Sequence, residues 1–137
     1  MNSSITISTN KSLLNVNFIH NYLSNQSYWA KGRTLVQVKK TIESCLCFGV
    51  YEHKEQIGFA RVLTDYVAFG YFMDVFVIDS HQHKGIGNLL LKSIMAHPEL
   101  TGVQRLMLAT QDAHTFYKKF GFDNLENPKI LMDIKRY

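Results

Sequence analysis

The feature that most constrains the fold is a long apolar run that ends in a glycine-containing turn and continues as an amphipathic helix. Residues 69–79 (FGYFMDVFVID) are apolar on both faces, as is typical of a central strand covered on both sides. Beyond the turn, apolar residues recur at helical spacing, at Ile86, Leu89, Leu90 and Ile94. This strand–turn–helix unit predicts a sheet whose faces are covered by helices.

The other strand patterns place further strands in the same sheet. Strands are expected at residues 4–8, 45–52, 57–64 and 104–110, and a closing strand is expected where Ile130, Met132 and Ile134 alternate with polar residues. The polar turn at residues 53–56 predicts an antiparallel hairpin.

Helix signals lie between these strands. From Ser12 onward, Leu14, Phe18 and Tyr22 recur every four residues. Thr34 and Gln37 have the spacing of a capping box, which predicts the start of a second helix. A last helix is expected at residues 112–120, with Asp112 as its N-cap and Gly121 as its left-handed stop. The sum is an α/β (α+β) fold with a single mixed, mostly antiparallel sheet and helices on both faces.

Size and composition allow one folded domain. Of the 137 residues, 46% are hydrophobic and 19% charged, which supports a buried core and excludes global disorder. No apolar run reaches the roughly 20 residues of a membrane helix. The N-terminus lacks the basic and apolar regions of a secretion signal. A cytoplasmic, reducing location is therefore expected, with Cys45 and Cys47 as core residues.

The net charge of +4 has several readings. It is compatible with a nucleic-acid surface, an acidic substrate or a phosphate-bearing cofactor. The basic residues are scattered in short pairs, without an arginine-rich arm or a basic helix stripe. The charge alone therefore does not select among these classes.

The glycine turn at residues 82–88 (QHKGIGN) is the most informative segment for function. Glycines let backbone N–H groups converge without obstruction by a Cβ atom, and the helix N-terminus adds a positive partial charge, so such a turn can hold a phosphate. The P-loop pattern is absent, and the dinucleotide fingerprint requires a third glycine where this chain has Leu90. A plain strand–helix turn, in which the glycines serve only geometry, is the alternative.

Two segments together resemble a known family. Gln82-x-x-Gly85-x-Gly87 resembles the acyl-CoA pyrophosphate loop of the GCN5-related N-acetyltransferase (GNAT) superfamily, whose pattern is Arg or Gln, two residues, Gly, one residue, then Gly or Ala. Residues 113–122 (AHTFYKKFGF) resemble the family's A-x-x-[FL]-Y-x-[KR]-x-G-F segment. The order of elements is also similar, so the resemblance covers nearly the whole chain. It implies a single N-acetyltransferase domain over residues 1–137.

The resemblance implies acetyl-CoA as co-substrate. In the family the central strand carries a bulge that splays it from the next parallel strand, and the pantetheine arm pairs with backbone groups there, which correspond to Phe76 and Val77. Asp112 stands where many relatives have an Asn that touches pantetheine, and Tyr117 is also expected at the cofactor. The pyrophosphate would bind the glycine loop, formed by Gln82, His83, Lys84, Gly85, Ile86, Gly87 and Asn88.

The resemblance also implies a mechanism. A neutral amine would attack the thioester directly, and Tyr117 would act as the general acid that protonates the departing thiolate. Asp74, on the central strand, is the first candidate for the base, and Asp65 is the second. Two alternatives stay open: Asp74 as a structural acceptor of hydrogen bonds from the backbone or Arg61, and Tyr117 as a core residue.

The acceptor is expected to be a primary amine of a small molecule or peptide. Tyr28, Trp29 and Arg33 lie in the loop that lines the acceptor side in the family, with hydrophobic anchoring as the alternative. His81, His83 and His114 cluster near the glycine loop without metal-ligand spacing, so no metal is expected.

Other functions and assemblies stay open. A non-catalytic acyl-CoA-binding regulatory module is the main alternative to an enzyme, because Asp112 departs from the family pattern and the base is uncertain. No nucleic-acid or membrane partner is expected. A homodimer through an exposed strand or the C-terminal edge is an expectation from the family.

Overall fold

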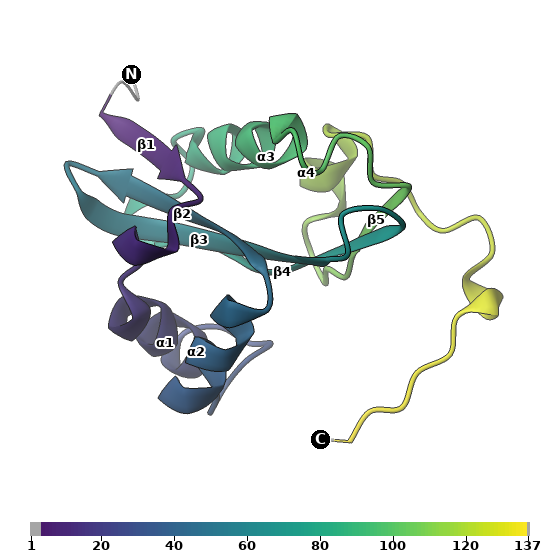
Figure 1. The fold of residues 1–137 in the computed structure, drawn as a ribbon, viewed down its shortest axis with the longest axis horizontal. Helices are drawn as coiled ribbons and strands as arrows, with labels where there is room; N and C mark the ends of the chain where they lie inside the picture. Colours follow the sequence, from purple (N-terminus) through teal and green to yellow (C-terminus); the bar gives the residue numbers. More distant parts are fainter. Residues whose placement is uncertain (1–3, 137) are drawn as a thin grey trace.

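The computed structural model describes residues 4–136, which form a five-stranded sheet in the order β1-β2-β3-β4-β5 (Figure 1). The strands are β1 (Ile5–Ser8), β2 (Leu46–Glu52), β3 (Glu55–Thr64), β4 (Phe69–Val77) and β5 (Arg105–Leu108). The first four pair antiparallel, whereas β5 runs parallel to β4. The predicted mixed, mostly antiparallel sheet is therefore confirmed.

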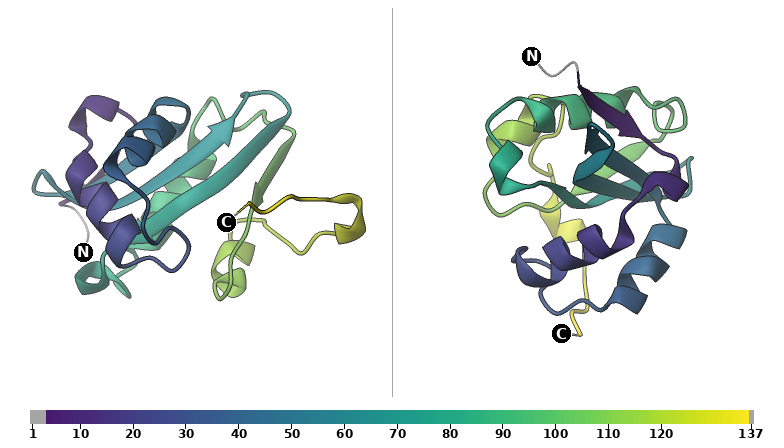
Figure 2. Two further views of the ribbon diagram at one scale, coloured as in Figure 1. Left: turned by 90° about the horizontal axis from the view of Figure 1, so that it is seen from below. Right: turned by 90° about the vertical axis from the view of Figure 1, so that its left-hand side faces the viewer.

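Helices cover both faces of this sheet. Helices α1 (Val16–Asn25) and α2 (Leu35–Glu43) lie on one face, and α3 (Ile86–Ala96) and the short α4 (His114–Lys118) lie on the other (Figures 1 and 2). Each face has its own apolar core. Leu90, Leu91 and Ile94 of α3 are fully buried on one side, and Ile19 and Val38 are fully buried on the other. No helix within residues 4–136 is long and apolar enough to cross a membrane.

Local sequence signals explain where several elements begin. The Thr34–Gln37 capping box is present, with the Thr34 hydroxyl accepting from the Gln37 N–H and the Gln37 side chain accepting from the Thr34 N–H. The first helix begins later than predicted: Lys11–Leu13 is a 3-10 turn, and Asn15 caps α1 by accepting from the Phe18 N–H.

The β2–β3 hairpin is tighter than predicted. His53 and Lys54 both adopt positive φ angles, which are the conformations of a two-residue hairpin turn. Glu55 and Gln56 therefore belong to β3 rather than to the turn.

Two predictions for the C-terminal part were wrong. Asp112 is not the N-cap of α4: the cap position belongs to Ala113, and no side chain caps it. The closing strand is also absent from the described residues. The chain after Phe122 leaves the body of the molecule beyond β5 and contains only a 3-10 turn at Pro128–Ile130 (Figure 1). Its alternating apolar side chains lie in solvent, with Met132 96% exposed, because alternation alone provides no partner strand.

Candidate active site

A bulge in β4 creates the site. Arg61 of β3 pairs with Met73 and Phe59 pairs with Phe76, so Asp74 and Val75 together lie opposite the single residue Ala60. Asp74 adopts a left-handed conformation with φ of 53°, which Asp tolerates better than most residues. The predicted bulge in the central strand is therefore present.

Beyond the paired segment, β4 and β5 separate. Their parallel pairing covers only Phe69–Phe72 of β4 and ends at Leu108 of β5. Phe76 and Val77 still pair with β3, so their edge toward β5 has no strand partner among the described residues. A cleft of about 540 Å³ lies at the separation and is lined by the bulge, by residues 108–113 from the end of β5 onward and by Tyr117. This edge is the position at which the resemblance of the sequence to the GNAT superfamily implies pantetheine.

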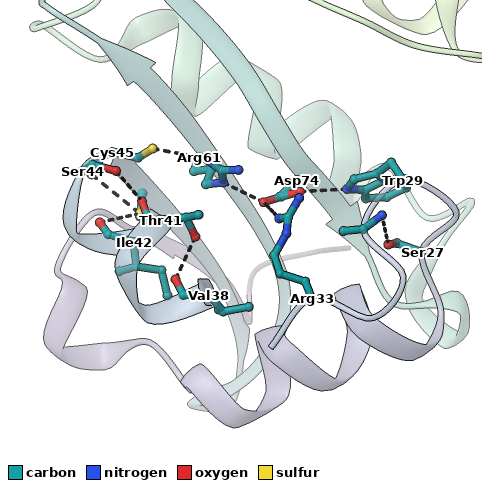
Figure 3. Close-up of polar contacts among 12 residues, drawn as sticks. Ser27, Trp29, Arg33, Val38, Thr41, Ile42, Ser44, Cys45, Arg61 and Asp74 are labelled. Atoms are coloured by element: carbon teal, nitrogen blue, oxygen red, sulfur yellow. Dashed lines mark hydrogen bonds and ion pairs between the residues drawn. The ribbon is translucent and has the colours of Figure 1, made fainter. Parts of the chain in front are cut away.

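Asp74 lies at the centre of a buried polar cluster (Figure 3). Its side chain is 2% exposed, and its Oδ2 accepts hydrogen bonds from Arg61 Nε at 2.6 Å and from Arg33 Nη1 at 2.7 Å. Its Oδ1 accepts from Trp29 Nε1 at 2.8 Å. A carboxylate has about four lone-pair positions, and the described residues supply three donors, two to Oδ2 and one to Oδ1. Acceptance from Arg61 is the structural role that the sequence left open.

Arg61 is held as a charged group inside the fold. Its side chain is 7% exposed, and Nη1 donates to Cys45 Sγ at 3.3 Å. Burial disfavours the guanidinium, but the charge and hydrogen bond of Asp74 outweigh burial and raise the pKa of Arg61 above its ordinary value. Arg61 lines the cleft, a role that sequence analysis missed because an isolated arginine in a strand carries no motif.

Hydrogen bonds of a buried serine hold the loop that carries Trp29 and Arg33. The buried Ser27 hydroxyl donates to the Leu23 carbonyl at 2.6 Å and accepts from the Ala30 N–H at 3.1 Å. Gly32 turns the chain with φ of +79°, and the α2 capping box follows directly. The loop therefore presents Trp29 and Arg33 to the cleft from a rigid base. Tyr28, which is 52% exposed, packs edge-on against Trp29 at a ring-centroid distance of 5.0 Å.

The glycine loop lies between β4 and α3 and does not line the cleft. His83 and Gly85 have positive φ angles of 62° and 81°, and Gly85 is the N-cap of α3. Ile86 is 2% exposed and anchors the helix start in the core. The first main-chain hydrogen bond of α3 runs from the Leu89 N–H to the Gly85 carbonyl. The N–H groups before it, including those of Gly87 and Asn88, therefore have no acceptor within the helix. Such a helix start favours an anion.

Gln82 joins the glycine loop to the end of β4. Its Nε2 donates to the Val77 carbonyl at 2.8 Å and to Asp79 Oδ1 at 3.2 Å. The side chain therefore acts here as a brace within the protein, while His83 and Lys84 form the exposed tip of the loop. The brace fixes the distance between the open strand edge and the start of α3.

Tyr117 reaches the cleft from α4. Burial raises the pKa of its hydroxyl to about 12, with smaller contributions from Tyr28 and Asp112. Its ring packs edge-on against Phe116 and Phe122, at centroid distances of 5.1 and 5.9 Å. Tyr117 is thus half-buried. It packs against the apolar core and also lines the cleft.

The other candidate residues make contacts that stabilise the fold. Asp65 accepts from three backbone N–H groups in the turn before β4 and does not line the cleft. Cys45 and Cys47 are buried, as predicted, and burial raises the pKa of Cys47 to about 11. His81 Nε2 lies 2.8 Å from Glu52 Oε1, and this hydrogen bond lowers the pKa of Glu52. Over residues 4–136, no three His, Cys, Asp or Glu side chains are grouped to hold a metal ion.

Comparison with known proteins identifies the family. Residues 43–124 match the family model of the acetyltransferase (GNAT) domain, which is more than half of the chain. The chain belongs to the GNAT family. It is 30% identical to FG08082 of Gibberella zeae, a predicted acetyltransferase, over 92% of this chain and 86% of that protein.

Solved structures agree with this GNAT fold. A predicted GNAT-family acetyltransferase of Xanthomonas campestris superimposes with a TM-score of 0.93 at 41% identity, covering 96% of this chain and 92% of that one. A GNAT acetyltransferase of Elizabethkingia anophelis, solved with acetyl-CoA bound, superimposes with a TM-score of 0.68 at 19% identity, covering 90% and 79% of the two chains. The protein is thus an N-acetyltransferase of the GNAT type.

Proposed function

We propose that residues 1–137 act as one cytoplasmic N-acetyltransferase domain that transfers the acetyl group of acetyl-CoA to a primary amine of a small molecule or peptide. The observation that carries this proposal is the bulge-derived cleft, because one cavity is lined by Asp74 and Val75 of the β4 bulge, next to the open strand edge, and by Tyr117. The acetyl-CoA bound to the Elizabethkingia anophelis relative supports the choice of co-substrate.

In this proposal, the edge of β4 and the glycine loop bind different parts of acetyl-CoA. The pantetheine arm would pair with the free edge of β4 at Phe76 and Val77, as an added strand does. The pyrophosphate would bind the N–H groups at the start of α3, between His83 and Asn88, where helix polarity favours an anion. Asp112 also lines the cleft, where its carboxylate can only accept hydrogen bonds.

The reaction is a direct transfer. The amine nitrogen attacks the thioester carbonyl carbon, and a backbone N–H near Phe76 stabilises the developing oxyanion. The C–S bond then breaks, and the Tyr117 hydroxyl protonates the departing thiolate. The raised pKa of Tyr117 keeps its phenol protonated at neutral pH, as this role requires.

The role of Asp74 as general base stays a prediction, and its surroundings favour another role. Three donors already occupy its oxygens, and two of them are guanidinium groups. We propose that Asp74 positions Trp29 and Arg33. The amine proton then leaves through water.

The test is release of CoA from acetyl-CoA with a broad panel of primary amines, comparing the wild-type protein with Tyr117→Phe. A general acid contributes roughly 10²–10⁴-fold to the rate, so we expect kcat to fall within this range while acetyl-CoA affinity is kept. Tyr66→Phe is the control, because Tyr66 is exposed in a turn outside the cleft.

An unchanged kcat in Tyr117→Phe would remove Tyr117 as general acid. If acetyl-CoA raises the thermal stability of the protein but no amine is acetylated, the chain is a regulatory acyl-CoA-binding module instead. Failure of acetyl-CoA to bind would refute both functions.

A further inference from the structure

The cleft has oppositely charged ends. Asp112 lies on the side of Tyr117, and its charge raises the pKa of the tyrosine hydroxyl. Arg33 and Arg61 lie on the other side, where the cleft continues into a second hollow that Asp112 and Tyr117 do not line. An acceptor that spans the cleft therefore meets a carboxylate near the reacting atoms and guanidinium groups away from them.

The second hollow strengthens the positive end. It has a volume of about 930 Å³ and shares Tyr28, Trp29 and both arginines with the cleft. Lys31 and Lys40 also line it, and none of its lining residues is an Asp or a Glu. Four cationic side chains thus surround this hollow, while the adjoining Asp74 can balance one of them.

Arg33 has the donors to bind an anion. Within residues 4–136 its side chain donates one hydrogen bond, from Nη1 to Asp74, out of the five N–H groups of a guanidinium. The side chain is 23% exposed, compared with 7% for Arg61, so it is reachable from the cleft. Asp74 fixes the orientation of Arg33 before any ligand binds, which reduces the entropy lost when a carboxylate or phosphate binds.

We infer that the acceptor is a primary amine that also carries an anionic group, a carboxylate or a phosphate, at its far end. The anion binds Arg33 with Lys31 and Lys40 close by, and the amine points toward Tyr117 and Asp112. A polycationic acceptor is disfavoured, because its distal charges would face the same four cations. This inference rests on the proposed acetyltransferase function and adds the class of acceptor to it.

The experiment compares amines that differ only at the far end. Straight-chain ω-amino carboxylates are paired with ω-amino alcohols of equal length, and phosphoethanolamine is paired with ethanolamine. We expect the anionic member to have at least a 10-fold higher kcat/KM, as a charge-assisted hydrogen bond provides. The pair with the larger ratio distinguishes a carboxylate from a phosphate.

Variants test whether Arg33 and its neighbours cause the preference. Arg33→Gln should reduce the anionic-to-neutral ratio of kcat/KM by about 10-fold or more, and Arg33→Lys should retain part of it. Lys40→Gln and Lys39→Gln are a matched pair on α2, because both remove one positive charge and only Lys40 lines the hollow. Only Lys40→Gln should lower the ratio.

The outcomes separate this inference from the proposed function. Equal or better acetylation of the neutral amines overturns the inference and leaves the acetyltransferase intact. If no amine is acetylated, the anion site is tested by the thermal stability of the CoA-bound protein with each member of a pair added. Selective stabilisation by the anionic member supports the anion site. Equal stabilisation by both members refutes it. An identical loss of preference in both lysine variants also refutes it, because net charge would then be the cause.

Discussion

The proposed cofactor and acceptor sides of the site are built by different means. On the proposed cofactor side, the groups are main-chain N–H groups of the glycine loop and the open edge of β4, and they lie close together along the chain. On the proposed acceptor side, the groups are side chains from two separate segments, the loop with Trp29 and Arg33 and strand β3 with Arg61, joined through the single carboxylate of Asp74. The cofactor side therefore depends on backbone conformation, and the acceptor side depends on one buried charge.

This difference predicts different failures. A change in backbone conformation should weaken acetyl-CoA binding without disturbing the buried ion pairs. A change in Asp74 should disturb the acceptor loop and the core together, because Arg61 is buried beneath it. The following predictions test this contrast in order of expected effect.

The largest effect is expected for Asp74→Ala. Removing one partner of a buried ion pair leaves an unpaired charge and typically costs 3–5 kcal/mol. We expect a loss of this size in the free energy of unfolding measured by urea denaturation. Asp74→Asn, which tolerates the left-handed conformation and still accepts hydrogen bonds, should lose less. Asp133→Ala, in the exposed C-terminal segment, is the control and should change stability by less than about 0.5 kcal/mol.

Alkaline pH should destabilise the protein through Tyr117, which lines the cleft. Its pKa is raised from 10.0 to about 12, so the folded protein keeps a proton that the unfolded chain loses over this range. The resulting stability is present in full below pH 10 and is lost as the pH rises toward 12. The difference in unfolding free energy between wild type and Tyr117→Phe should shift by about 2 to 3 kcal/mol across this window. Cys47 is present in both proteins, so its titration cancels in the difference. If the unfolding free energies of wild type and Tyr117→Phe change in parallel with pH, burial of the Tyr117 hydroxyl is contradicted.

Gly85→Ala should damage the cofactor side alone. A left-handed conformation costs a residue with a Cβ atom about 1–2 kcal/mol, and Gly85 has φ of +81°. We expect weaker acetyl-CoA binding by calorimetry with the Asp74 cluster intact. Gly102→Ala is the matched control, since a Cβ there meets no atom within 4 Å and the backbone is not left-handed. Equal effects of the two substitutions would show that the conformation of the glycine loop is not what binds the cofactor.

The smallest effect is expected for Thr34→Ala. Loss of an N-cap costs about 1 kcal/mol, and Thr34 directly follows Arg33 in the chain. We expect a loss of this size in urea denaturation, together with a raised KM for the amine and unchanged acetyl-CoA affinity. Thr9→Ala, at an exposed position outside the helices and strands, should leave all three quantities unchanged.

The same contrast explains what could be predicted from the sequence. The capping box, the hairpin and the glycine loop each depend on residues a few positions apart, and all three are present in the structure. The partners of Asp74 could not be read in this way, because Arg33 lies 41 residues from it and Trp29 lies 45. Only folding of the acceptor loop onto the sheet brings these side chains together.

The wrong predictions share a cause. The N-cap at Asp112 and the closing strand with Ile134 were both read from residue type and spacing without knowledge of the partner group. A cap requires a side chain that reaches the first N–H groups of the helix, and a strand requires an edge with which to pair. In the described chain, Ala113 holds the cap position and the C-terminal segment lies away from the sheet.

The shared carboxylate of Asp74 has a consequence for how this enzyme can evolve. Replacing Arg33 alone alters the ligand wall and also the balance of charge beneath it, so the effect of each mutation depends on which residues occupy the other positions. Under the proposed acceptor site, a change of acceptor at Arg33 would require residues compatible with Asp74 and Arg61. The glycine loop lies outside this cluster, so under the proposed function the affinity for acetyl-CoA and the choice of acceptor can be selected separately.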